Sequence, residues 1–282
     1  MSKKSSSSAS PLPPTPARVA EAFARARGEN RAAFVAYLTA GDPGVSETEE
    51  MALALDRAGA DVLELGVAFS DPIADGPVLQ RAAERALAAG VGLEEVFGIA
   101  RRIRARTRLG LVLFSYLNPL LARGLDRVAR EAREAGFDGV LITDLPPEEA
   151  GEPAEAFRRE GLDQIFLVSP TSPAQRMRRA ARLSRGFLYV VSRSGTTGQR
   201  ARLPEDLEKT VARARHAAGA LPIAVGFGIA TPESAAAAAR LADGVVVGSA
   251  LVAAAAEAGS GRVRALGSLA ARLVAACRRG AK

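Results

Sequence analysis

Residues 61–77 read DVLELGVAFSDPIADGP, a short apolar run followed at once by an acidic loop. Residues 62–66 form a short apolar run typical of a strand, yet Glu64 stands in its middle. Because strand side chains alternate between faces, the two leucines beside Glu64 point one way and Glu64 points the other. A carboxylate aimed into a sheet is costly unless it is paired or used. The following loop adds Asp71 and Asp75, so this strand end is predicted to be catalytic.

Short apolar runs of this kind recur along the chain, rich in Val, Ile and Leu and not cleanly alternating. Such runs are typical of strands buried on both faces, and hence of a parallel sheet. Two of these runs, 62–66 and 139–143, come shortly after an Ala-Gly pair, in the stretches 58–66 and 135–144, and such a pair suits a helix C-cap. The eight runs are 33–38, 62–66, 111–115, 139–143, 164–169, 187–192, 222–226 and 244–248.

Ala/Glu/Arg-rich stretches with helical spacing separate the runs. One helix is expected to open on a capping box of Ser46 and Glu49. The others are expected near 17–27, 78–89, 93–106, 124–134, 147–160, 173–184, 203–217, 231–241, 249–257 and 261–278.

Eight strand-then-helix units predict an α/β fold, a (β/α)8 TIM barrel with an extra N-terminal helix. A doubly wound open sheet is the alternative. The dinucleotide glycine fingerprint is missing after the first run, which weakens the nucleotide-binding version of that alternative. One barrel domain is expected over 16–282. Residues 1–15 are Ser- and Pro-rich and are expected to be a disordered tail.

The composition limits the classes of molecule that the chain is expected to bind. The 282 residues carry a net charge of +7, which suits an anionic substrate. The arginines are scattered and no basic block alternates with aromatics, so nucleic acid is not expected. No apolar stretch approaches the roughly 18 residues of a membrane span. The single cysteine, Cys277, allows no internal disulfide or zinc cluster and favours a cytoplasmic location.

The candidate catalytic groups lie at the C-terminal ends of the predicted strands, where barrel active sites are built. The only histidine, His216, stands in a helical stretch, so proton transfer is expected to fall to carboxylates or tyrosine. No metal-ligand spacing, nucleophile elbow or strand-end lysine is present. Asp71 precedes a proline and is interpreted as a turn residue. The polar residues at strand ends are Glu64, Asp71, Asp75, Tyr116, Asn118, Asp144, Tyr189 and Arg193.

Glycine-rich turns end the last three predicted strands: SGTTG at 194–198, GFGI at 226–229 and GSAL at 248–251. Glycines let backbone N–H groups approach an anion, and Ser249 would begin a helix whose positive end favours phosphate. Two such turns on consecutive late strands predict a phosphate site. The basic, Gly/Thr-rich stretch 193–202 is expected to form a mobile lid over it.

The chain resembles the tryptophan synthase α-subunit family over nearly all of residues 17–280. The matching stretches are LTAGDPG at 38–44, LELGVAFSDPIADGP at 63–77, SRSGTTG at 192–198, GFGI at 226–229 and VVGSALV at 246–252. The resemblance implies a (β/α)8 barrel that cleaves indole-3-glycerol phosphate to indole and glyceraldehyde 3-phosphate. It also implies a pyridoxal-phosphate-dependent β subunit as partner, usually as an αββα heterotetramer, with no cofactor or metal in this chain.

Carried over by position, the resemblance makes Glu64 and Asp75 the catalytic carboxylates and Tyr189 a third catalytic residue. It places Thr197 in the lid. Tyr37 and Phe114 stand where smaller or non-hydroxylated apolar residues are expected around the indole. The implied substrate-binding set is Tyr37, Phe114, Tyr116, Thr197, Gly198, Gly226, Phe227, Gly228, Gly248 and Ser249.

Two alternatives stay open from the sequence. One is a stand-alone lyase that releases indole without needing a β subunit. The other is a chain retained mainly as an activating partner of the β subunit, with weak catalysis of its own.

Overall fold

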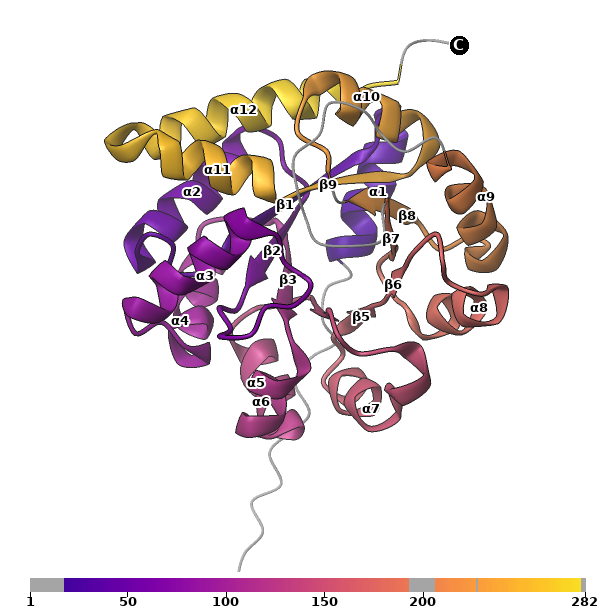
Figure 1. The fold of residues 1–282 in the computed structure, drawn as a ribbon, viewed down its shortest axis with the longest axis horizontal. Coiled ribbons are helices and arrows are strands. Elements are labelled where there is room, and N and C mark those ends of the chain that lie inside the picture. The colour runs from indigo at the N-terminus through magenta and orange to yellow at the C-terminus, as the bar shows by residue number, and fades with distance from the viewer. Residues whose placement is uncertain (1–17, 193–205, 227, 280–282) are drawn as a thin grey trace, which may run out of the picture.

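The computed structural model describes residues 18–192, 206–226 and 228–279. Within these ranges, parallel strands form one nine-stranded sheet in the order β5-β4-β3-β2-β1-β9-β8-β7-β6, and helices surround it (Figure 1). The (β/α)8 barrel prediction is confirmed. The strands are β1 (Ala33–Thr39), β2 (Val62–Gly66), β3 (Gly110–Ser115), β4 (Gly139–Ile142), β5 (Asp163–Ile165), β6 (Leu167–Val168), β7 (Leu188–Val191), β8 (Ile223–Gly226) and β9 (Gly244–Val247).

The predicted fifth strand is broken in two, and this break closes the barrel. Its first half, β5, pairs with β4, and its second half, β6, pairs with β7. Between the halves, the Phe166 carbonyl accepts a hydrogen bond from the Tyr189 N–H at 3.1 Å. The segment 163–168 therefore pairs with the strands at both ends of the sheet. The apolar composition of the predicted strand gives no sign of this break.

Most helices lie where their periodicity predicts. The expected 124–134 helix is preceded by a further helix, α5, because Gly124 at φ 91° separates the two. The helices are α1 (Arg18–Gly28), α2 (Val45–Arg57), α3 (Pro77–Ala88), α4 (Leu93–Arg104), α5 (Leu117–Arg123), α6 (Leu125–Glu134), α7 (Gly151–Arg159), α8 (Ala174–Leu183), α9 (Leu207–Ala218), α10 (Pro232–Leu241), α11 (Ser249–Glu257) and α12 (Arg262–Ala276), with 3-10 turns η1 (Pro147–Glu149) and η2 (Gly259–Gly261).

The capping box expected at the start of α2 is wrong. The helix begins at Val45 after Gly44, and no side chain caps it. The Ser46 hydroxyl instead donates to the Glu47 carboxylate at 2.9 Å. Thr48 ties down the turn, donating to the Gly44 carbonyl and accepting from the Gly41 N–H.

Two apolar cores divide the strand side chains between them. Leu63 and Leu65 belong to the outer core between sheet and helices, whereas Val62 belongs to the core inside the barrel. Glu64 shares the face of Val62, as the alternation along the strand predicts. The interior also takes in Phe23 of α1.

Helix α1 lies across one opening of the barrel (Figure 1). Its arginines form ion pairs with aspartates at the N-terminal ends of the strands. Three aspartates begin or precede strands there, and each accepts a hydrogen bond from the backbone N–H of a neighbouring strand. Two of them, Asp61 and Asp138, follow the Ala-Gly pairs at 58–59 and 135–136. The ion pairs from α1 are Arg18–Asp138 at 2.8 Å, Arg25–Asp61 at 3.0 Å and Arg27–Asp243 at 4.0 Å. The opposite rim is left for the site.

None of the helices in the described part of the chain is both long and apolar enough to cross a membrane.

Candidate active site

Glu64 is a buried carboxyl group inside the barrel. Only 1% of the residue is exposed, and its Oε1 has no hydrogen-bond partner among the described residues. Burial raises the pKa of Glu64 to about 8, because the charged form loses its hydration. Glu64 is therefore mainly protonated at neutral pH and can still lose its proton just above it. These are the properties of a proton shuttle.

Asp75 lies at the end of the loop that follows β2, just before α3. It is nearly buried, and burial raises its pKa to about 6. A hydrogen bond from the Tyr116 hydroxyl to Oδ2, at 3.0 Å, works in the opposite direction and lowers that pKa. Asp75 is thus mostly ionised at pH 7, where Glu64 is mostly neutral. The two carboxyl groups differ in protonation, as a division into base and acid requires.

Tyr116 also holds the backbone of the loop. Its hydroxyl accepts a hydrogen bond from the Ala74 N–H at 3.0 Å while it donates to Asp75. The side-chain amide of Gln80 in α3 donates to the Asp75 carbonyl at 2.8 Å. The sequence placed Tyr116 among the polar strand-end residues and in the implied substrate-binding set, without a hydrogen-bond partner. An aromatic residue after an apolar run carries no signal of a partner 41 positions away.

Two further tyrosines sit inside the barrel above strand glycines. A Cβ atom at Gly226 would lie 2.1 Å from the Tyr189 hydroxyl, and one at Gly66 would lie 2.2 Å from the Tyr37 hydroxyl. Both glycines are therefore required by the space that these hydroxyls occupy. Burial is the largest cause raising the pKa of Tyr189, and the charges of Glu64 and Asp75 raise it further. Tyr189 consequently stays protonated near the carboxyl pair.

Aromatic side chains form the wall beside Glu64. In the sheet register Tyr37 is opposite Glu64. The Tyr37 ring meets Phe114 edge-on at a centroid distance of 5.0 Å, and its hydroxyl lies 3.3 Å from the Thr39 hydroxyl. Phe69 stacks obliquely on Tyr116 at 5.2 Å. This wall offers the flat apolar contact that an aromatic ligand needs.

The glycine turns gather at one corner of the rim. Strands β8 and β9 pair in parallel, so Gly226 at the end of β8 and Gly248 just after β9 lie at the same edge. Ser249 begins α11, and Gly228 has a φ of 87°. A helix start beside glycine backbone suits an anion. Thr197, Gly198, Phe227 and the expected lid at 193–202 lie outside the described residues.

The remaining strand-end carboxylates have local partners. Asp71 is exposed, its carboxylate accepts from the Ser70 hydroxyl at 2.7 Å, and its carbonyl accepts from the Ile73 N–H. Those bonds agree with its interpretation as a turn residue. The Asp144 carboxylate accepts the Leu117 N–H at 2.7 Å at the start of α5. No cluster of three or more His, Cys, Asp or Glu in the described ranges could hold a metal ion.

Fold and site together define a (β/α)8-barrel enzyme with two buried carboxyl groups, Glu64 and Asp75. Residues 23–278 match the family model described as tryptophan synthase alpha chain. The chain is 50% identical over 235 residues to the tryptophan synthase alpha chain of Geobacter sulfurreducens, covering 83% of this chain and 89% of the relative. The Solibacter usitatus protein of the same name is 51% identical, with 83% and 88% covered.

Comparison with solved structures points to the same family. Tryptophan synthase subunit alpha from Legionella pneumophila superposes with a TM-score of 0.84 at 38% identity, over 92% of this chain and 98% of that one. A chain of Mycobacterium tuberculosis tryptophan synthase gives 0.86 at 36% identity, over 95% and 100%. The chain belongs to the tryptophan synthase alpha chain family. It is thereby a lyase of tryptophan biosynthesis, the class that cleaves indole-3-glycerol phosphate.

Proposed function

We propose that Glu64 and Asp75 carry the retro-aldol cleavage of indole-3-glycerol phosphate to indole and glyceraldehyde 3-phosphate. The observation that carries this assignment is the split protonation of two buried carboxyl groups at one rim, with a pKa of about 8 for Glu64 and about 6 for Asp75. One group can donate a proton at neutral pH while the other accepts one.

In the first step the Asp75 carboxylate takes the proton from indole N1 while the Glu64 carboxyl gives its proton to C3. The indole becomes its indolenine tautomer, which can accept the electron pair of the bond to the side chain. Glu64, now a carboxylate, then removes the proton of the adjacent side-chain hydroxyl. That carbon becomes the aldehyde, the carbon–carbon bond breaks, and Asp75 returns its proton to N1.

The other predicted residues bind the substrate. Tyr189 is proposed as a catalytic neighbour of Glu64, because the charge of that glutamate acts on it. Tyr37, Phe114 and Tyr116 would flank the indole ring. The phosphate would lie where β8, β9 and α11 meet, against Gly226, Phe227, Gly228, Gly248 and Ser249. Thr197 and Gly198 would contact it from the expected lid at 193–202.

The partner in this proposal is a tryptophan synthase β subunit, in an αββα assembly, and pyridoxal phosphate is placed in that subunit alone. Two large apolar side chains stand exposed beside the rim, Ile73 at 76% and Leu121 at 51%. Ile73 belongs to the loop held by Tyr116, and Leu121 to α5, which follows Tyr116 directly. Exposed apolar side chains on these two segments suit a subunit that receives indole. The proposal includes a cytoplasmic location.

Glu64→Gln is the decisive variant. Glutamine keeps the shape but cannot ionise, so turnover should fall by at least about 1,000-fold while a non-cleavable substrate analogue still binds. Glu134→Gln, at an exposed position on α6, is the matched control and should retain full rate. Substantial lyase activity in Glu64→Gln would refute the assignment.

A lyase assay with and without added β subunit separates the remaining alternatives. Strong stimulation supports the assembled enzyme. A high rate without the partner supports a stand-alone lyase, and no measurable rate in either condition supports a chain retained mainly as an activating partner.

A further inference from the structure

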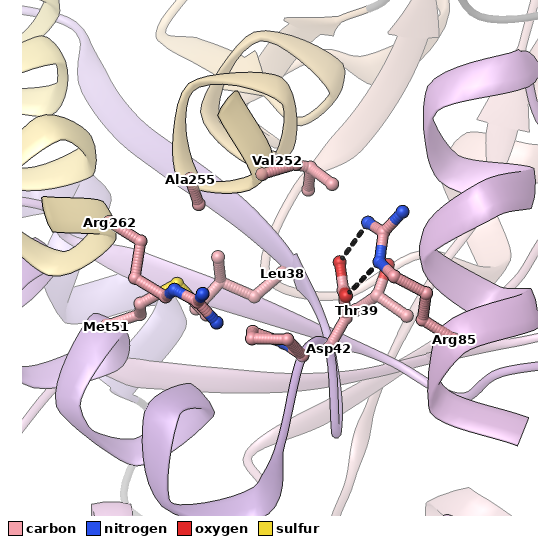
Figure 2. A pocket seen from close by; sticks show the side chains of 10 residues that line it. Leu38, Thr39, Asp42, Met51, Arg85, Val252, Ala255 and Arg262 are labelled. Atoms are coloured by element: carbon pink, nitrogen blue, oxygen red, sulfur yellow. Dashed lines mark hydrogen bonds and ion pairs between the residues drawn. The ribbon is translucent and has the colours of Figure 1, made fainter. Parts of the chain in front are cut away.

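A second cavity opens beside the barrel, separate from the carboxyl pair. Its volume is about 200 Å³, and it lies between the end of β1, α2, α3, α11 and the start of α12 (Figure 2). That volume is below the roughly 300–1,000 Å³ of sites for drug-sized ligands. Any occupant must therefore be small.

One side of the cavity is occupied by a closed ion pair. Arg85 of α3 binds Asp42 through two parallel hydrogen bonds of 2.7 and 2.8 Å (Figure 2). Both carboxylate oxygens are engaged, and Asp42 is buried. The pair contributes no net charge, and it forms a polar wall of fixed geometry.

The other side carries an uncompensated cation. Arg262 points toward Met51 and Leu38, and its Nε donates to the Gly259 carbonyl at 2.6 Å (Figure 2). Its two terminal nitrogens have no hydrogen bond or ion pair with any residue in the described ranges. The charge of Arg262 lowers the pKa of Glu47, as the smallest of the causes that act on that carboxyl group. A guanidinium whose two terminal nitrogens are free can bind a carboxylate through that edge.

Apolar side chains complete the walls between these two groups. Leu38 lies between Arg262 and the ion pair, and Val252 and Ala255 face it from α11 (Figure 2). Leu38, Val252 and Ala255 are each at most 6% exposed, so the wall beside Arg262 is narrow and apolar and offers a bare inorganic anion no further polar partner. A compact apolar body matches such a wall.

We propose that this cavity is a binding site for a small organic monocarboxylate, with the carboxylate on Arg262 and an aromatic or branched body against Leu38, Met51, Val252 and Ala255. This inference is independent of the proposed roles of Glu64 and Asp75. It concerns a different cavity and requires no catalysis.

Calorimetric titration with benzoate tests the proposal. The protein is first saturated with a non-cleavable substrate analogue, so that the barrel site is filled. Benzoate should then bind at one site per chain with a dissociation constant of about 1 mM or tighter, in keeping with a fragment-sized ligand. Benzyl alcohol lacks the charge and acetate lacks the apolar body, so each should bind at least about tenfold more weakly.

Two variants locate the site. Arg262→Gln should weaken benzoate binding at least about tenfold, because a charge-assisted pair is lost. Arg264→Gln, exposed two residues along α12, is the matched control and should bind as the wild type does. Ala255→Leu should block binding by filling the cavity. Equal benzoate affinity in wild type and Arg262→Gln, or no saturable binding to the wild type, would overturn the proposal.

Discussion

The Tyr116 hydroxyl donates to Asp75 Oδ2 at 3.0 Å and accepts the Ala74 N–H at the same distance. One side chain on the barrel wall thus holds both the backbone of the loop after β2 and the Asp75 carboxylate. The loop is otherwise tied by bonds within itself and to α3. Tyr116 therefore positions Asp75 and lowers its pKa against the larger, raising effect of burial.

Tyr116→Phe should lower kcat by about ten- to a hundredfold, the range expected when a hydrogen bond to a charged group is lost. Because this bond lowers the pKa of Asp75, its loss should also shift the acid limb of the kcat profile to higher pH. Steady-state rates from pH 4.5 to 9 measure both effects. Tyr37→Phe is the control, since its hydroxyl contacts Thr39, and it should leave the acid limb in place. An unshifted limb in Tyr116→Phe would argue against the positioning role.

The wild-type enzyme should show a bell-shaped dependence of kcat/KM on pH. The proposed mechanism requires Asp75 to be ionised and Glu64 to be protonated, so the rate should fall below a pKa of about 6 and above a pKa of about 8. Rates measured with substrate well below KM report these values for the free enzyme. A profile that stays flat up to pH 9.5 would contradict the assignment of Glu64 as the acid.

Glu64 should also make stability depend on pH. Burial raises its pKa from 4.5 to about 8 in the folded chain, so the folded state holds the proton more tightly than the unfolded state. The stabilisation is complete below about pH 4.5 and is lost as pH rises through 8. That loss amounts to up to about 5 kcal/mol, at about 1.4 kcal/mol per pKa unit.

Glu64→Gln has no group that titrates at this position. Its free energy of unfolding should be close to that of the wild type at pH 5, and should exceed it increasingly toward pH 9. Urea unfolding at pH 5, 7 and 9 measures the difference. If the difference is the same at all three values, burial does not raise the Glu64 pKa.

The aspartates at the opposite rim should contribute strongly to stability. Asp61 is buried and accepts from the Phe34 N–H at 2.8 Å, from Arg31 Nη2 at 2.8 Å and from Arg25 at 3.0 Å. Asp61→Ala leaves these donors without a partner and should cost about 3–5 kcal/mol.

Asp126→Ala provides the comparison in urea unfolding. Asp126 pairs with Arg159 on the surface, where both side chains are exposed. Its loss should change the free energy of unfolding by no more than about 0.5 kcal/mol. Similar losses in the two variants would mean that the rim aspartates act only as surface charges.

Local patterns in the sequence were enough to predict the barrel architecture and to single out Glu64 as an unusual buried carboxyl group. Apolar runs alternating with helical stretches predicted the barrel, and the period of two along residues 62–66 placed Glu64 inside it. Both inferences hold because alternation and helical spacing are local properties of the chain. The capping box at Ser46 failed because a short side-chain bond to Glu47 competed with it.

Which distant groups meet depends on the tertiary fold and not on local sequence patterns. The hydrogen bond from Tyr116 to Asp75 spans 41 positions, the ion pair between Arg18 and Asp138 spans 120, and the fifth strand splits so that the barrel can close. These depend on strand register and on the direction of individual side chains, which no local pattern encodes. The raised pKa of Glu64 belongs to the same class, because it arises from burial by side chains that come from all around the barrel.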